Sequence, residues 1–260
     1  MQAANRNLEA RVQERTEELE KALARLSELT QMKANFISNV SHELRTPLTH
    51  VKGYLELMVS GSLGALSNEQ QHALEVSQKS AARLEEMIDD LIMFSLTSKG
   101  EFSIKQEAVD ISRLANLAVK SAMEKASDRD VTVHAVVDDG VPVVRADSQK
   151  IAWVLSQLLD NGIKFTPAGG RVVLSIKPES SNLVMISITD TGIGIPASRI
   201  EEIFEPFHQL DEKATRKYGG AGLGLSLVRQ IVEAHGSLLD VQSVEGHGTT
   251  FRFPLLMIES

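Results

Sequence analysis

The 260-residue sequence contains no cysteine, only 4% aromatic residues and no long apolar run. The absence of cysteine excludes disulfides, thiolate metal sites and a cysteine nucleophile. No stretch approaches the roughly 18–20 apolar residues that a membrane-spanning helix needs. The N-terminal residues also lack the short apolar core of a signal peptide. We therefore expect no membrane segment in this chain, and a cytoplasmic protein or the cytoplasmic part of a larger, membrane-anchored one.

Acidic residues outnumber basic ones, with 35 Asp and Glu against 27 Lys and Arg and a formal net charge of −8. Because a negative surface repels a phosphate backbone, we expect no nucleic-acid partner. Hydrophobic residues make up 42% of the chain, an ordinary globular composition with length for one or two domains. Nine of the 17 glycines lie between Gly192 and Gly248. This distribution predicts long helices first and a glycine-punctuated α/β region after them.

Residues 8–40 carry apolar side chains at alternating spacings of four and three. This heptad pattern is typical of a two-stranded coiled coil, and its narrow apolar stripe favours a partner helix. Arg15 and Lys33 interrupt the stripe, where they lower stability and can fix the register. We expect residues 1–35 to form a signalling coiled coil in a homodimer; a solvated helix packed within one chain is the alternative. The stripe consists of Leu8, Val12, Arg15, Leu19, Ala22, Leu26, Leu29, Lys33, Phe36 and Val40.

Residues 36–100 are predicted to form a helical hairpin. A turn rich in Gly and Ser at 60–64 ends its first helix, and Ser67 with Gln70 has the spacing of a capping box that begins the second. Pro47 removes one backbone hydrogen bond from the first helix, so we expect a local bend there. Two copies of such a hairpin would close the core of a four-helix bundle.

His42 lies about 200° around the first helix from the apolar stripe, so its side chain is expected in solvent. A neutral imidazole is nucleophilic, and the Glu43 carboxylate can hold one ring proton while the other nitrogen attacks phosphorus. Thr46 follows one turn later on the same face and can position a water. The spacing excludes a zinc site, because no His-Glu-x-x-His pattern is present. A lone exposed histidine is usually only a surface residue, so these neighbours carry the argument.

Residues 103–258 are predicted to form an α+β sandwich, in which a mixed sheet carries helices on one face. Asp110 and Asp147 are the expected N-caps of its first two helices. The expected helices are 111–126, 148–164 and 223–235. The expected strands are 103–106, 131–137, 141–145, 171–177, 183–189, 238–243 and 249–254, with a hairpin turn at 178–182.

Several polar and glycine motifs in this region carry groups suited to binding a ligand. Gln157, Asn161 and Lys164 lie on one helix, where a polar face would explain them equally well. Asp190 follows a strand and can accept a hydrogen bond from an exocyclic amine, while the glycines after it let a flat ring approach the backbone. A second glycine run opens a helix, whose backbone amides suit phosphate oxygens. The glycines of the two runs are Gly192, Gly194, Gly219, Gly220, Gly222 and Gly224.

The order of these motifs is more specific than any one of them. The stretch 41–48 resembles the phosphoacceptor box of two-component sensor histidine kinases. The motifs downstream are similar to the catalytic ATP-binding domain of the same family, whose fold is shared with gyrase, the Hsp90 chaperones and MutL. The resemblance covers residues 36–258. It implies ATP and Mg²⁺ as cofactors, a homodimer, and a response regulator receiver domain as partner.

The resemblance also implies the reaction and the residues of the helical part. ATP would phosphorylate His42, and the group would pass to an aspartate of the response regulator, on which phosphatase activity is also expected. Glu43 and Thr46 would be the catalytic neighbours of the histidine. On the nucleotide helix, Asn161 matches a Mg²⁺ ligand and Lys164 a residue that reaches the phosphates.

Further roles follow for the glycine-rich region. Asp190 matches the residue that reads the adenine amino group, and Thr249 would assist it through its hydroxyl. Residues 196–222 would form a mobile lid over the triphosphate, anchored by Phe204 and Phe207. Five glycines complete the set: Gly192 and Gly194 as the floor beneath the base, and Gly220, Gly222 and Gly224 as the lid hinge and phosphate contact.

Three departures and two alternatives accompany this interpretation. Gly162 replaces a common Ala. Gln157 stands where the family often has a second Asn, and Gln209 where some members place a phosphate-binding Arg, which leaves the nucleotide affinity open. The chain could instead be a degenerate kinase that acts as a scaffold or only as a phosphatase. It could also be an ATPase machine of the same fold, but such a machine would not need the exposed His42 on a helical hairpin. Incubation with labelled ATP distinguishes these possibilities.

Overall fold

The computed structural model describes residues 2–98, 103–180, 182–209 and 222–258. The chain divides into two compact units, Met1–Phe102 and Ser103–Ser260. Within the described residues, no helix combines the length and hydropathy needed to cross a bilayer.

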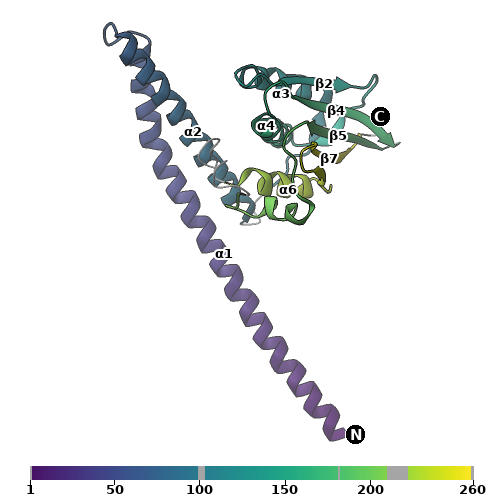
Figure 1. Cartoon of the computed structure of the whole chain (residues 1–260). Helices are drawn as coiled ribbons and strands as arrows, with labels where there is room; N and C mark the ends of the chain where they lie inside the picture. Colours follow the sequence, from purple (N-terminus) through teal and green to yellow (C-terminus); the bar gives the residue numbers. More distant parts are fainter. Residues whose placement is uncertain (1, 99–102, 181, 210–221, 259–260) are drawn as a thin grey trace. The chain divides into compact units, whose positions relative to one another are not determined.

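The first unit is a pair of helices, α1 (Gln2–Val59) and α2 (Asn68–Ser98) (Figure 1). The predicted capping box is confirmed: the Ser67 backbone N–H donates to Gln70 Oε1 at 2.9 Å, and the Gln70 N–H donates to Ser67 Oγ at 3.2 Å. These two bonds satisfy donors that the first turn of α2 would otherwise leave unpaired. α1 runs as one helix through Pro47, and the bend expected there stays a prediction.

The hairpin has a small core. Leu48 of α1 and Ala81 and Ile88 of α2 are buried, with Leu55 and Ile92 packed against them. Several larger apolar side chains of the same two helices remain exposed. A single hairpin therefore does not cover its own apolar surface. The exposed set includes Val51, Tyr54, Leu57 and Leu84.

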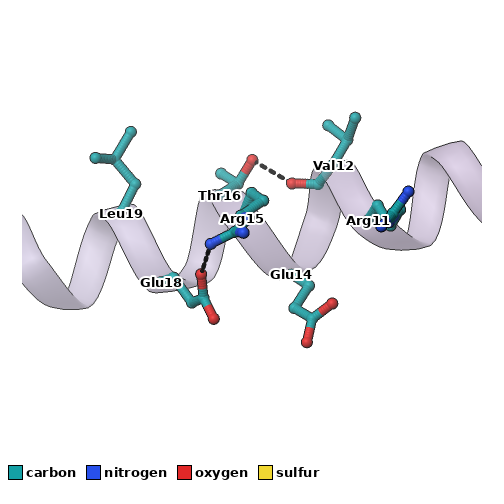
Figure 2. A pocket seen from close by; sticks show the side chains of 7 residues that line it. All are labelled: Arg11, Val12, Glu14, Arg15, Thr16, Glu18 and Leu19. Carbon is teal, nitrogen blue, oxygen red and sulfur yellow. Dashed lines mark hydrogen bonds and ion pairs between the residues drawn. The ribbon is translucent and has the colours of Figure 1, made fainter.

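The N-terminal part of α1 is more exposed still. Figure 2 shows Val12 and Leu19 on one side of the helix, with Glu14 and Glu18 on the other. Arg15 forms an ion pair with Glu18 at 2.7 Å, so this basic residue is paired along its own helix. Five apolar residues of the stripe face solvent in this chain, because Val12, Leu19, Leu26, Leu29 and Phe36 are each at least 56% exposed.

The second unit is built on a five-stranded mixed sheet of order β2-β4-β5-β7-β6 (Figure 1). β2 and β4 run parallel, and the other neighbours run antiparallel. The strands are β2 (Thr132–Val137), β4 (Arg171–Ser180), β5 (Leu183–Asp190), β7 (Gly248–Leu256) and β6 (Asp240–Val244). A separate pair joins β1 (Glu107–Val109) to β3 (Val144–Ala146).

Helices cover one face of this sheet. They are α3 (Ile111–Ser127), α4 (Ser148–Phe165) and α6 (Gly224–Ala234), with short 3₁₀ turns η1 (Ala197–Arg199) and η2 (Glu202–Phe204). The six apolar residues expected on the inner side of α4 are all buried, and alternate residues of β4, β5 and β7 are buried with them. The predicted sandwich of a mixed sheet with helices on one face is confirmed. The inner residues of α4 are Ile151, Val154, Leu155, Leu158, Leu159 and Ile163.

Both predicted helix caps are confirmed in this unit. Asp110 accepts from the Arg113 backbone N–H at 2.9 Å, and Asp147 accepts from the Lys150 N–H at 3.1 Å. Each carboxylate satisfies one of the unpaired donors at a helix N-terminus.

Three strand predictions were wrong in position. No strand forms at 103–106, because the Lys105 N–H donates to an Asp147 carboxylate oxygen and pairing with β3 begins only at Glu107. The strand expected at 141–145 lies at 144–146, because only these residues pair with β1. β4 continues through Pro178 to Ser180, beyond the end expected at residue 177. Pairing between β2 and β4 ends at Ile176. Pro178 lies beyond that point, so its missing N–H removes no hydrogen bond between these two strands.

Because the inner face of the sheet is buried, we expect a cavity there to lower the free energy of unfolding substantially. Leu174→Ala, at a fully buried position of β4, should lower the free energy of unfolding of this unit by about 2–5 kcal/mol. The same change at Leu117, which is 54% exposed on α3, should cost about 0.5 kcal/mol or less. The fluorescence of Trp153, the single tryptophan, reports on this unit during urea unfolding. Equal losses in the two variants would show that the sheet face is not the core.

Candidate functional site

The first candidate group lies on α1. His42, Glu43 and Thr46 are all exposed, so the prediction that the histidine faces solvent is confirmed. Arg45 forms an ion pair with Asp89, which ties α2 to this turn of α1. The nucleophilic candidate therefore stands on a supported helix while its ring stays accessible to a reaction partner.

The second group centres on Asp190, at the end of β5. This carboxylate is only 8% exposed, and its Oδ1 accepts from the backbone N–H groups of Gly192 at 2.8 Å and Thr249 at 3.1 Å. Oδ2 has no hydrogen-bond partner within the described parts of the chain. Burial raises the pKa of Asp190 above its usual value, against the opposing effect of the two backbone donors. One oxygen thus fixes the carboxylate, and the other can accept a ligand's amine.

The loop after Asp190 requires two glycines. A Cβ on Gly192 would lie 2.6 Å from the carbonyl oxygen of Phe165, and one on Gly194 would lie 2.0 Å from that of Val244. Gly194 also has a φ of 65°, in the left-handed region that favours glycine. The loop therefore lies directly against the end of α4 on one side and the β6–β7 turn on the other.

Thr249 contacts Asp190 through its backbone, and the role of its hydroxyl at the base stays a prediction. Its backbone N–H, and not its hydroxyl, donates to the carboxylate. The hydroxyl lies 2.9 Å from Ser243 Oγ, which also accepts from the Ile195 N–H at 2.8 Å. Ser243 was missed from the sequence, although its place opposite Thr249 in the β6–β7 hairpin would have indicated it.

The polar residues of α4 form a half-buried stripe at spacings of four and three. The side-chain amide of Asn161 has no hydrogen-bond partner among the residues that the structure describes. Gln157 lies against the start of α6: a Cβ on Gly224 would be 2.7 Å from its Oε1. Lys164 places its ammonium 5.1 Å from the centre of the Phe165 ring. The structure thus brings Gln157 and Gly224, which are far apart in sequence, to one place.

The two phenylalanines of the lid segment differ. Phe204 is 7% exposed and packs under the guanidinium of Arg229, whose central carbon is 3.7 Å from the ring centre. Phe207 is 51% exposed, and its N–H donates to the carbonyl oxygen of Gly222 at 2.9 Å. Its role as a lid anchor stays a prediction, because residues 210–221 of the expected lid lie outside the described residues. Gly220 lies outside the described residues.

An accessible histidine on a helical hairpin, together with a buried aspartate among glycine loops in an α+β sandwich, defines the class of ATP-dependent histidine kinases. Two family models match the chain. The His Kinase A (phospho-acceptor) domain covers residues 32–99, and the histidine kinase-, DNA gyrase B- and HSP90-like ATPase covers residues 146–258. The chain belongs to the sensor histidine kinases and comprises their phosphoacceptor and ATPase domains.

Known relatives agree with this assignment. The circadian input-output histidine kinase CikA of Synechococcus elongatus is 36% identical over 96% of this chain and 33% of its own length. Sensor histidine kinase WalK of Bacillus subtilis is 36% identical over 87% of this chain and 37% of its own length. Full-length ShkA in complex with AMPPNP has a TM-score of 0.73 and 27% identity over 87% of this chain and 47% of that chain. The chain therefore spans about a third of the curated relatives it matches.

The geometry at Asp190 predicts how nucleotide affinity depends on pH. Asp190→Asn should weaken ATP binding by about 1.5–3 kcal/mol, the range for a hydrogen bond to a charged group. Because the pKa of Asp190 is raised, protonation removes the Oδ2 acceptor at a higher pH than for an ordinary carboxyl. The affinity of the unmodified protein should therefore fall on acidification, starting above the usual carboxyl range, and the Asn variant should lack this loss.

Calorimetric titration with ATP and GTP at several pH values measures both effects. Asp240→Asn is the matched control, since that carboxylate pairs with Arg252 at 2.6 Å on an exposed strand. It should leave ATP affinity unchanged. GTP, which has an oxygen in place of the adenine amine, should compete poorly. Equal binding of GTP and ATP would contradict the role of Asp190.

Proposed function

We propose that this chain is a histidine kinase core that transfers the γ-phosphoryl group of ATP to His42. One observation carries the proposal: the same chain holds an accessible His-Glu pair on a helical hairpin and a buried carboxylate with one unpaired oxygen beside a glycine floor. The His-Glu pair supplies a nucleophile, and the carboxylate supplies a hydrogen-bond acceptor for the adenine amino group. The two groups lie in separate compact units of the chain, and phosphoryl transfer needs both.

The transfer step is a displacement at phosphorus. The Glu43 carboxylate holds a ring proton of His42, so that the other ring nitrogen keeps its lone pair. That nitrogen bonds to the γ-phosphorus as the bond to the β–γ bridging oxygen breaks, and ADP leaves with the electron pair. Since such a transition state needs little covalent help, the protein contributes mainly position and charge stabilisation.

Nucleotide binding is proposed to combine three parts of the second unit. Asp190 Oδ2 accepts from the adenine amine, and Gly192 and Gly194 let the ring lie against the backbone. Lys164 and the start of α6 at Gly224 face the phosphates.

Mg²⁺ fits the residues present. Within the described residues no cluster of three His, Asp or Glu side chains could hold a metal by itself. The half-buried Asn161 offers an amide oxygen without a protein partner. Mg²⁺ keeps several waters and binds substrate phosphates, so one such ligand suffices. When bound, the ion neutralises phosphate charge, and Gln157 lies one turn before Asn161 to contact the phosphates.

The partners proposed are a second copy of the chain and the receiver domain of a response regulator. The exposed apolar stripe of α1 and the uncovered apolar side chains of the hairpin support the homodimer, because two hairpins would cover this surface together. The receiver aspartate would take the phosphoryl group from His42. Thr46, exposed one turn from His42, would position a water for hydrolysis of the phosphorylated regulator.

The proposed division of labour predicts separable defects. His42→Gln should abolish incorporation of ³²P from labelled ATP and leave ATP affinity within about threefold, since the acceptor and the nucleotide site belong to different units. His50→Gln, at an exposed histidine two turns along α1, is the control and should label normally. Persistent labelling of the His42 variant would refute the acceptor assignment. A parallel loss of ATP affinity would refute the division between units.

The neighbours of His42 should separate the two activities. Glu43→Gln should slow phosphorylation of His42 strongly, because an amide cannot hold the imidazole proton as an anion does. Thr46→Ala should spare phosphorylation and slow dephosphorylation of the regulator. Single-turnover labelling measures the first reaction, and loss of label from a purified phosphoregulator measures the second. Equal loss of both activities in both variants would show that these roles are assigned wrongly.

A further inference from the structure

Two buried polar residues, Asp147 and His235, meet where α4 begins and α6 ends. The Asp147 backbone N–H donates to His235 Nε2 at 3.0 Å, and His235 Nδ1 lies 2.7 Å from the carbonyl oxygen of Ile231. A backbone N–H can only donate, so Nε2 is the acceptor and Nδ1 carries the proton that bonds Ile231. The imidazole is therefore neutral, with both nitrogens in use, and it is 7% exposed.

The Asp147 side chain makes a second set of bonds. Its Oδ1 accepts from the Lys150 N–H, and its Oδ2 accepts from Lys150 Nζ at 2.6 Å and from the Lys105 N–H at 3.1 Å. Burial is the largest influence and raises the pKa of Asp147, but the bonds from Lys150 and Lys105 together hold it below the usual value. The carboxylate is therefore ionised, and an anion holds the backbone at Lys105 in place.

The junction of Asp147 and His235 joins three segments that matter to the proposed reaction. Lys105 lies near the start of the second unit, where the chain enters from the helical hairpin. α4 carries Asn161 and Lys164 farther along the same rigid helix. α6 begins at Gly224, beside Gln157, and ends at the junction. No residue of the junction itself is among those expected to touch nucleotide.

We propose that the Asp147–His235 junction is a positioning device that couples occupancy of the nucleotide site to the backbone by which the chain enters the α/β unit. The inference rests on the proposed function of that site. Nucleotide between α4 and the start of α6 restrains both helices, and the junction is where the two helices share a direct bond. Coupling between sites is reciprocal, so fixing α4 against α6 also strengthens the hold on Lys105.

The alternative is that these bonds only stabilise the fold. The two explanations differ in one measurable quantity, the ratio of hydrogen-exchange rates at Lys105 without and with nucleotide. If the bond is purely structural, its loss raises the exchange rate at Lys105 by the same factor with and without nucleotide. A coupling bond changes the ratio itself when Lys105 exchanges by local opening. Nucleotide also slows exchange that requires global unfolding, so a variant that is only destabilised, Leu174→Ala, is needed to show which route applies.

The test is hydrogen exchange of the full chain, with and without AMPPNP and Mg²⁺, read at the Lys105 amide. In the unmodified protein, nucleotide should slow exchange about fivefold or more. Asp147→Asn keeps a good helix cap but presents an NH₂ in place of one acceptor, so it cuts the bond to Lys105. His235→Leu cuts the bond to α6. Both should bring the ratio near one while AMPPNP still binds within about threefold.

Three control variants sharpen the result. His235→Gln should keep the ratio, because its amide can accept from Asp147 and donate to Ile231. Asp110→Asn, at the cap of α3, and the destabilising Leu174→Ala should also keep it. The proposal is overturned if AMPPNP binds but leaves Lys105 unchanged in the unmodified protein, or if Asp147→Asn keeps the full ratio. If His235→Leu does not fold, Asp147→Asn and His235→Gln decide. Failure of AMPPNP to bind the unmodified protein would instead refute the proposed function.

Discussion

The buried carboxylate of Asp190 is the interaction on which the nucleotide-binding half of this protein depends. Both of its backbone donors converge on one oxygen, so the end of β5 is tied at once to the following loop and to β7. The same arrangement leaves the second oxygen free to recognise a ligand. Because the carboxylate is buried, it is sensitive to protonation, and its recognition of an amine depends on the protein keeping those two donors in place.

The helical unit leaves much of its apolar surface exposed to solvent. One hairpin buries only a handful of side chains, and the stripe that precedes it faces solvent along most of α1. A second copy would satisfy this surface and would still leave His42 accessible, since the histidine lies on a different face of the same helix. The uncovered apolar surface and the exposure of His42 thus follow from one pattern of residues.

Features set by neighbours in sequence could be predicted well. The capping box at Ser67 and the cap at Asp110 depend on residues three apart, and the structure contains both. Features set by long-range pairing could not. The strand expected at 103–106 was displaced because the Lys105 N–H found a partner 42 residues away.

The same limit applies to the candidate site. The motif predicted Asp190 as a site residue, but it did not show that two backbone N–H groups, one of them from Thr249 in β7, would bond to the same carboxylate oxygen. The family resemblance implied that Phe207 anchors the lid, but it did not show that the ring would be 51% exposed or that the backbone N–H would bond to Gly222. His235 carries no local signal at all, since its role comes from the end of one helix meeting the start of another.

The most direct test of the central claim is the chemical position of the phosphate. The protein should be incubated with Mg²⁺ and ATP, quenched in alkali to preserve phosphohistidine, and digested for mass spectrometry. The account predicts one phosphate on the peptide that contains His42, stable in alkali and lost in acid. Phosphate on any other residue, or ATP hydrolysis with no phosphoprotein formed, would contradict it.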